Sequence, residues 1–142
     1  MLTALREKIR DRKATVCVLG LGRVGLPLSI VLARSGLRVI GVDVDQRKVS
    51  MIREGRVPFY YPVIVEWLKM VLAKGMFTAT DQSKESIERS DVVIVTVGTP
   101  TGTQYQLDYS QLHLAMEEVA LADIRNKAVI MRSTAVPGTV MN

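Results

Sequence analysis

The chain has 142 residues, of which 48% are hydrophobic and 23% charged, a balance typical of a folded globular domain and unlike that of a disordered chain. Its net charge is +5, but residues 1–13 alone carry +3, so the basic charge is concentrated at the N-terminus and is a weak argument for nucleic-acid binding. The single cysteine excludes an intramolecular disulfide and a multi-thiolate metal site.

The first predicted elements follow from apolar spacing. Leu2, Leu5 and Ile9 recur at helical intervals among charged residues, which predicts a short basic amphipathic helix within residues 1–13. The apolar run 14–19 is typical of a parallel strand buried on both faces. Residues 24–35 then predict a helix that Gly36 ends.

The same alternation continues along the chain. An Asp at position 45 is suited to cap a helix reaching about residue 54, and Asp108 with Gln111 predicts a capping-box start for a later helix. The remaining predicted helices are 64–74 and 82–89, and the remaining predicted strands are 39–42, 76–79, 92–97 and 128–131.

Strands that alternate with helices predict an α/β fold: a doubly wound parallel sheet of the Rossmann type, with about five strands and helices on both faces. We expect the leading helix at 1–13 and one domain over 14–142. The N-terminus has no secretory signal, and the longest uncharged stretch, 92–107, is too short and too turn-rich to span a membrane. A soluble, cytoplasmic protein without a membrane partner is therefore expected.

The clearest chemical motif is the G-x-G-x-x-G run of Gly20, Gly22 and Gly25. The motif alone is weak, but here it directly follows a predicted strand and opens a predicted helix. In that context Gly20 permits a tight turn, Gly22 leaves room for a pyrophosphate, and Gly25 allows close packing of helix on strand. The free N–H groups at the helix start then favour phosphate binding.

Asp43 ends the second predicted strand, 23 residues after Gly20. A carboxylate at this place accepts hydrogen bonds from the adenosine ribose and repels a 2′-phosphate, so NAD is expected in preference to NADP. The nearby cations Arg47 and Lys48 weaken that preference, because either could receive a 2′-phosphate. No metal site is predicted, and the lone His113 is expected on a solvated helix face.

Two further loops follow predicted strands, where open α/β sheets bind ligands. They are 97–101, Val-Gly-Thr-Pro-Thr, and 132–139, which begins Arg-Ser-Thr and ends Pro-Gly-Thr. Together with the glycine motif 20–27, the segment 41–43 and the segment 107–109, they make residues 14–142 resemble the NAD-binding domain of the UDP-glucose/GDP-mannose dehydrogenases.

The resemblance implies an NAD-dependent enzyme that oxidises a UDP- or GDP-sugar alcohol to the uronic acid, a four-electron reaction that uses two NAD. It implies a nucleotide-sugar substrate, a role in polysaccharide biosynthesis and a full-length homodimer, and it implies a catalytic role for Thr134, which would help to order the catalytic water. The cofactor-binding residues that it implies are Gly20, Gly22, Arg23, Val24, Gly25, Asp43 and Lys48 around the adenosine half, and Val97, Gly98, Thr99, Pro100, Thr101, Ser133 and Thr134 toward the nicotinamide half.

The sequence departs from the family in the segment 58–64. The family's Pro-x-x-Glu-Pro-Gly-Leu keeps its prolines here, but Tyr61 and Val63 replace Glu and Gly. The family's nucleophilic cysteine would lie beyond Asn142, and Cys17 is expected to be an inert core thiol. We therefore expect this chain to bind NAD without catalysing turnover.

Two alternatives remain open from the residues. A non-catalytic NAD-sensing regulatory Rossmann domain would need the glycine loop and Asp43, but has no need of the loop 132–139. Another NAD-dependent dehydrogenase, acting on a hydroxy acid, would share a similar first half.

Overall fold

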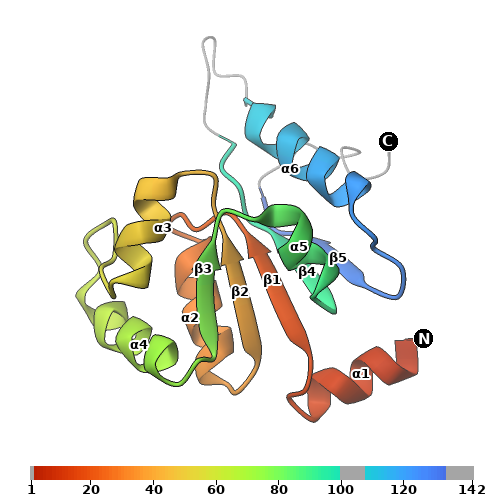
Figure 1. Ribbon diagram of the computed structural model, residues 1–142, viewed down its shortest axis with the longest axis horizontal. Coiled ribbons are helices and arrows are strands. Elements are labelled where there is room, and N and C mark those ends of the chain that lie inside the picture. Colours follow the sequence, from red (N-terminus) through yellow and green to blue (C-terminus); the bar gives the residue numbers. More distant parts are fainter. Residues whose placement is uncertain (1, 100–107, 134–142) are drawn as a thin grey trace.

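The computed structural model describes residues 2–99 and 108–133, and it contains the predicted alternation of strands and helices (Figure 1). Each element lies within a few residues of its predicted position. The helix predicted over 64–74 begins two residues earlier, at Pro62. In chain order the elements are α1 (Leu2–Arg10), β1 (Thr15–Leu19), α2 (Gly25–Arg34), β2 (Arg38–Val42), α3 (Gln46–Arg53), α4 (Pro62–Ala73), β3 (Phe77–Thr80), α5 (Ser83–Glu88), β4 (Val92–Val95), α6 (Ser110–Leu121) and β5 (Ala128–Met131).

The strands form one parallel sheet in the order β3-β2-β1-β4-β5. From β1 the chain builds outward through β2 and β3, and it then crosses back to place β4 on the other side of β1. The order therefore reverses between β1 and β4, and ligands of open α/β sheets bind beyond the carboxyl ends of the strands at this point. The predicted five-stranded doubly wound sheet is confirmed.

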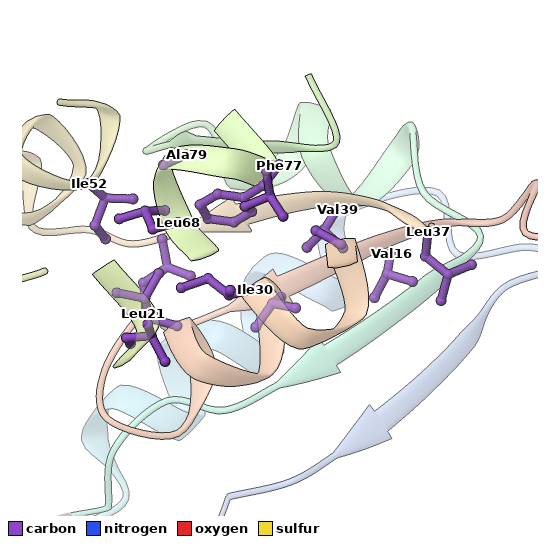
Figure 2. Close-up of a cluster of buried hydrophobic side chains, with 14 of the residues drawn as sticks. Val16, Leu21, Ile30, Leu37, Val39, Ile52, Leu68, Phe77 and Ala79 are labelled. Carbon is purple, nitrogen blue, oxygen red and sulfur yellow. The ribbon is translucent and has the colours of Figure 1, made fainter. Parts of the chain in front are cut away.

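Alternate residues of the central strands point to opposite faces of the sheet, and each face has its own core. Val16, Val18 and Val39 pack against α2, α3 and α4. Figure 2 shows Val16 and Val39 within this cluster. Cys17 and Ile40 instead pack with α5 and α6 on the other face. Helices on both faces explain why the central strands read as continuous apolar runs.

The outer strand β5 is less covered than the sequence suggested. Val129 and Ile130 are 38% and 47% exposed, whereas the central strands are largely buried. Strand β5 pairs only with β4 among the described residues, so it forms an edge of the sheet there. Helices on both faces are thus observed for the centre of the sheet, and not for this edge.

The start of α6 corrects the capping-box prediction. The residue at the helix N-cap is Tyr109, and no side chain caps it. Asp108 lies one residue earlier, and its Oδ1 accepts the N–H and the hydroxyl of Ser110 at 2.9 and 2.5 Å. These two bonds hold the pKa of Asp108 below its ordinary value. A short Asx turn satisfies the carboxylate locally, so the Asp does not reach the N–H three residues on. Asp45 does cap α3 as predicted, accepting from the N–H groups of Arg47 and Lys48.

Helix α1 lies beneath the amino ends of the strands (Figure 1). Lys8 Nζ lies 2.9 Å from Asp91 Oδ1, and the other carboxylate oxygen accepts the Thr15 N–H at 2.9 Å. Partial burial opposes ionisation of Asp91, but these partners hold its pKa below the ordinary value. Leu5 packs on the core, whereas Leu2 and Ile9 are exposed. Within the described ranges, no helix is long and apolar enough to cross a membrane.

Candidate dinucleotide-binding site

The glycine turn between β1 and α2 forms the floor of the candidate site. Gly20 has a φ of +100°, which a residue with a side chain rarely adopts, and a Cβ there would approach Val97 N to 2.9 Å. Its own N–H donates to Val42 O at 2.8 Å. The turn is thus held between the ends of β2 and β4.

The other two glycines of the motif differ in how much space surrounds them. A Cβ on Gly25 would lie 1.7 Å from Gly20 O and 2.5 Å from Thr96 Oγ1, so only glycine permits this approach of helix to strand. A Cβ on Gly22 would meet nothing within 4 Å. Gly22 is therefore not required for internal packing, and the space beside it opens outward.

Helix α2 leaves its first N–H groups free for a ligand. Leu26 N–H donates to Gly22 O at 3.1 Å, so the N–H groups of residues 23–25 precede the first intrahelical hydrogen bond. Together with the helix dipole, such groups favour an anion at this end.

Asp43 is the buried acid of the site. Its Oδ2 accepts the Leu21 N–H at 2.9 Å, and its Oδ1 accepts the Asp45 N–H at 2.9 Å. Lys48 Nζ lies 3.2 Å from Oδ2, and the two side chains form an ion pair. These contacts hold the carboxylate beside the glycine turn.

These elements enclose a cleft of about 520 Å³ at the point where the strand order reverses. Its volume falls within the range of small-molecule and cofactor sites. Of the predicted site residues, the lining includes Gly20, Gly22, Arg23, Val24, Asp43, Lys48, Val97 and Gly98.

Three further predicted site residues that the structure describes do not line the cleft. Gly25 is packed beneath the turn, and Thr99 and Ser133 are not in the lining of the cleft. The Ser133 hydroxyl donates to Val97 O at 2.7 Å, so it ties the segment after β5 to the one after β4. Pro100, Thr101 and Thr134 lie outside the described residues, and their predicted roles stay predictions.

Sequence analysis missed a group of residues on and near α6. Gln111, Leu114 and Glu118 line one side of the cleft. Their spacing of three and four residues places them on one helical face, but which face meets the cleft depends on how α6 packs on the sheet. The sequence signal that could have suggested them is the exposed Leu114, an apolar residue outside the buried face of the helix.

Thr96 was also missed, although it locks the glycine turn. Its hydroxyl lies 3.0 Å from Leu19 O and 2.7 Å from Gly20 O, and its side chain is buried. The available signal was a single threonine within the otherwise apolar run 92–97.

Replacing Thr96 tests this lock. We expect Thr96→Val, which keeps the shape and removes the hydroxyl, to lower the free energy of unfolding by about 1–2 kcal/mol, because Gly20 O loses its hydroxyl donor. Leu19 O still accepts the backbone N–H of Thr96 in this variant. Chemical denaturation measures this change. Thr96→Ser is the matched control and should retain most of the stability; equal losses in both variants would contradict the role of the hydroxyl.

Two other candidate groups, Cys17 and His113, do not line the cleft. Burial raises the pKa of the Cys17 thiol to about 12, so it stays protonated, as expected of a core thiol. His113 is exposed on α6, as predicted. Over residues 2–99 and 108–133, no three His, Cys, Asp or Glu side chains gather as metal ligands would.

A parallel sheet with a glycine turn, an exposed helix start and an acid at the end of β2 defines a dinucleotide-binding domain of the Rossmann type. Comparison with known proteins agrees: the family model described as "UDP-glucose/GDP-mannose dehydrogenase family, NAD binding domain" matches residues 14–142. The chain belongs to this family, as its NAD-binding domain. The predicted cofactor, NAD, and the predicted family are thereby confirmed.

Individual relatives differ in their substrates. The chain is 34% identical over 131 residues to the GDP-mannose 6-dehydrogenase of Pseudomonas aeruginosa, covering 89% of this chain and 30% of the relative. It is 38% identical over 124 residues to the UDP-N-acetyl-D-mannosamine dehydrogenase of Pyrococcus horikoshii, covering 87% and 29%. The chain thus spans about a third of the length of these relatives.

Solved structures share the fold. A ternary complex of GDP-mannose dehydrogenase from Pseudomonas aeruginosa superimposes with a TM-score of 0.86 at 32% identity, covering 89% of this chain and 30% of that one. The NDP-N-acetyl-D-galactosaminuronic acid dehydrogenase of Methanosarcina mazei gives a TM-score of 0.84 at 25% identity, covering 97% and 31%.

Proposed function

We propose that the cleft holds NAD with its adenosine ribose on Asp43 and its pyrophosphate over Gly22. The observation that carries this assignment is the fixed carboxylate of Asp43, 2.9 Å from Leu21 N, next to the open space at Gly22. The carboxylate supplies an acceptor for ribose hydroxyls, and the free N–H groups at the start of α2 supply donors for the phosphates.

The same carboxylate favours NAD over NADP, because a 2′-phosphate would bring a second negative charge to Asp43. Lys48 Nζ forms an ion pair with Asp43 Oδ2 at 3.2 Å, so the negative charge of Asp43 is partly compensated. We infer that Lys48 orients the carboxylate and contributes to the adenosine side. Arg23 and Val24 then complete the phosphate side of the cleft.

We place the nicotinamide half toward Val97, Gly98, Thr99 and Ser133, with Pro100, Thr101 and Thr134 following from the family resemblance alone. The bond from Ser133 to Val97 O supports this proposal, since it joins the two loops that would surround that half. Bound NAD would supply the hydride acceptor, and the chain's own groups would position it and exclude water. The role of Thr134 in ordering a catalytic water remains part of the proposal.

The proposed reaction of the longer enzyme is the oxidation of a nucleotide-sugar alcohol to the uronic acid with two NAD, in a homodimer. The names of the relatives support a nucleotide-sugar substrate and include both GDP- and UDP-linked sugars. The two alternatives, a regulatory sensor and a hydroxy-acid dehydrogenase, gain no such support.

We expect this 142-residue chain to bind NAD and to show no turnover. Its single cysteine is Cys17, which lies buried in β1 and cannot act as a nucleophile. The test follows absorbance at 340 nm with NAD and, in turn, UDP-glucose, GDP-mannose and UDP-N-acetylmannosamine. NADH formation with any of them would overturn the proposal that the chain is inactive alone.

A further inference from the structure

Two arginines at the ends of α2 each lie against an aromatic ring. The Arg23 guanidinium is 5.9 Å from the centroid of Phe59, and that of Arg34, at the far end of the helix, is 3.7 Å from the centroid of Trp67. Of the two arginines, Arg23 lines the cleft. The pair at the glycine turn therefore joins the candidate site to the segment that precedes α4.

We propose that Phe59 is a positioning residue, which holds the Arg23 guanidinium where it binds the pyrophosphate of the dinucleotide. This inference rests on the proposed function, since it assumes that the pyrophosphate lies over Gly22. It assigns a role to the segment 57–61, which does not line the cleft and which departs from the family pattern at Tyr61.

The two partners differ in how firmly they are held. Phe59 is half-buried and packs against the core cluster formed with α2, α3 and α4. Arg23 is exposed, and within the described residues no carboxylate lies within ion-pair distance of its guanidinium. The ring is thus the fixed partner, and the guanidinium keeps its full charge available for an anion.

A guanidinium can serve both partners at once. Its flat face packs on an aromatic ring, whereas its N–H groups point outward in the plane and match phosphate oxygens. The guanidinium carbon of Arg23 lies over the Phe59 ring at 5.9 Å from its centroid, within reach of a cation–π attraction that uses none of the N–H groups in a hydrogen bond. This contact also limits the conformations of a long side chain before the ligand binds, which reduces the entropy that binding must remove.

The test is a double-mutant cycle with two ligands, ADP-ribose, which contains the pyrophosphate, and adenosine, which does not. Binding of ADP-ribose is measured by calorimetry, and that of adenosine by competition. We expect Phe59→Leu to weaken ADP-ribose binding about three- to fivefold and Arg23→Ala about tenfold or more, with adenosine unchanged. The double variant should match Arg23→Ala alone, because Phe59 acts through Arg23.

The control is Trp67→Leu, which removes the ring beneath Arg34 at the other end of α2 and should leave the ratio of the two affinities unchanged. Arg23→Lys is a further variant, which leaves the half-buried ring of Phe59 unchanged. It keeps the positive charge but loses the planar guanidinium, so it should weaken ADP-ribose binding about as much as Phe59→Leu.

Three results separate the hypotheses. Additive effects of Phe59→Leu and Arg23→Ala would overturn the positioning role, as would an Arg23→Lys variant that binds ADP-ribose like the wild type. Wild-type chain that binds neither ADP-ribose nor NAD would instead overturn the proposed function, and this inference with it.

Discussion

Substituting alanine for Gly25 is expected to lower the free energy of unfolding by about 3 kcal/mol, a large part of the stability of a domain of this size. The added Cβ would lie 1.7 Å from Gly20 O, a backbone atom that cannot move without opening the contact between the turn and β4. Chemical denaturation followed by circular dichroism measures the loss.

Gly22→Ala is the matched control, because it makes the same chemical change three residues earlier in the same turn. Its Cβ would enter open space, so the free energy of unfolding should change by less than about 1 kcal/mol. NAD affinity should nevertheless fall about 10- to 100-fold, because the methyl group occupies the space assigned to the pyrophosphate. Equal stability losses in the two variants, or unchanged NAD affinity in Gly22→Ala, would contradict these assignments.

Asp43→Asn is expected to reduce NAD affinity about 10- to 100-fold and to reduce the preference for NAD over NADP. The amide keeps one oxygen to accept from Leu21 or Asp45, but it loses the negative charge that we propose binds the ribose hydroxyls and repels a 2′-phosphate. Titration of both cofactors, corrected for the folded fraction, gives the two affinities.

Asp45→Asn is the control for this variant, since Asp45 also lines the cleft and loses the same charge. Asparagine is a good N-cap, so α3 should be retained. NAD affinity close to wild type is expected. If Asp43→Asn behaved like this control, the ribose-binding role of Asp43 would be wrong.

The parts of the site that depend on local chain pattern were predictable from the sequence. The glycine turn follows a buried strand directly, and Asp43 ends the next strand, so parallel pairing of β1 and β2 brings them together. The register pairs Leu19 with Val42, so the residues that follow β1 and β2 lie side by side at the carboxyl ends of these strands. No long-range information was needed for this half of the cleft.

The parts that depend on tertiary contacts were not predictable. The face of α6 that carries Gln111 lines the cleft, and this placement depends on how the helix packs on the sheet. Thr96 lay within a predicted strand, and its role depends on carbonyls 76 and 77 residues away in the chain. Asp108 and Gln111 had the spacing of a capping box, but the Asp108 carboxylate instead accepts the N–H of Ser110, only two residues away.

The same distinction applies to the contact of Arg23 with Phe59. The two residues are far apart in the sequence, and neither belongs to a pattern that predicts the other. Helix α4 packs against α2, and the contact of Arg23 with Phe59 joins the segment before α4 to the glycine turn.

The most direct test of the account is a calorimetric titration of the wild-type chain with NAD and, separately, with NADP. We expect one NAD per chain, and NADP binding at least about tenfold weaker, because a 2′-phosphate would face the buried carboxylate of Asp43. Absence of NAD binding by a folded chain, or tighter binding of NADP, would contradict the assignment of this cleft.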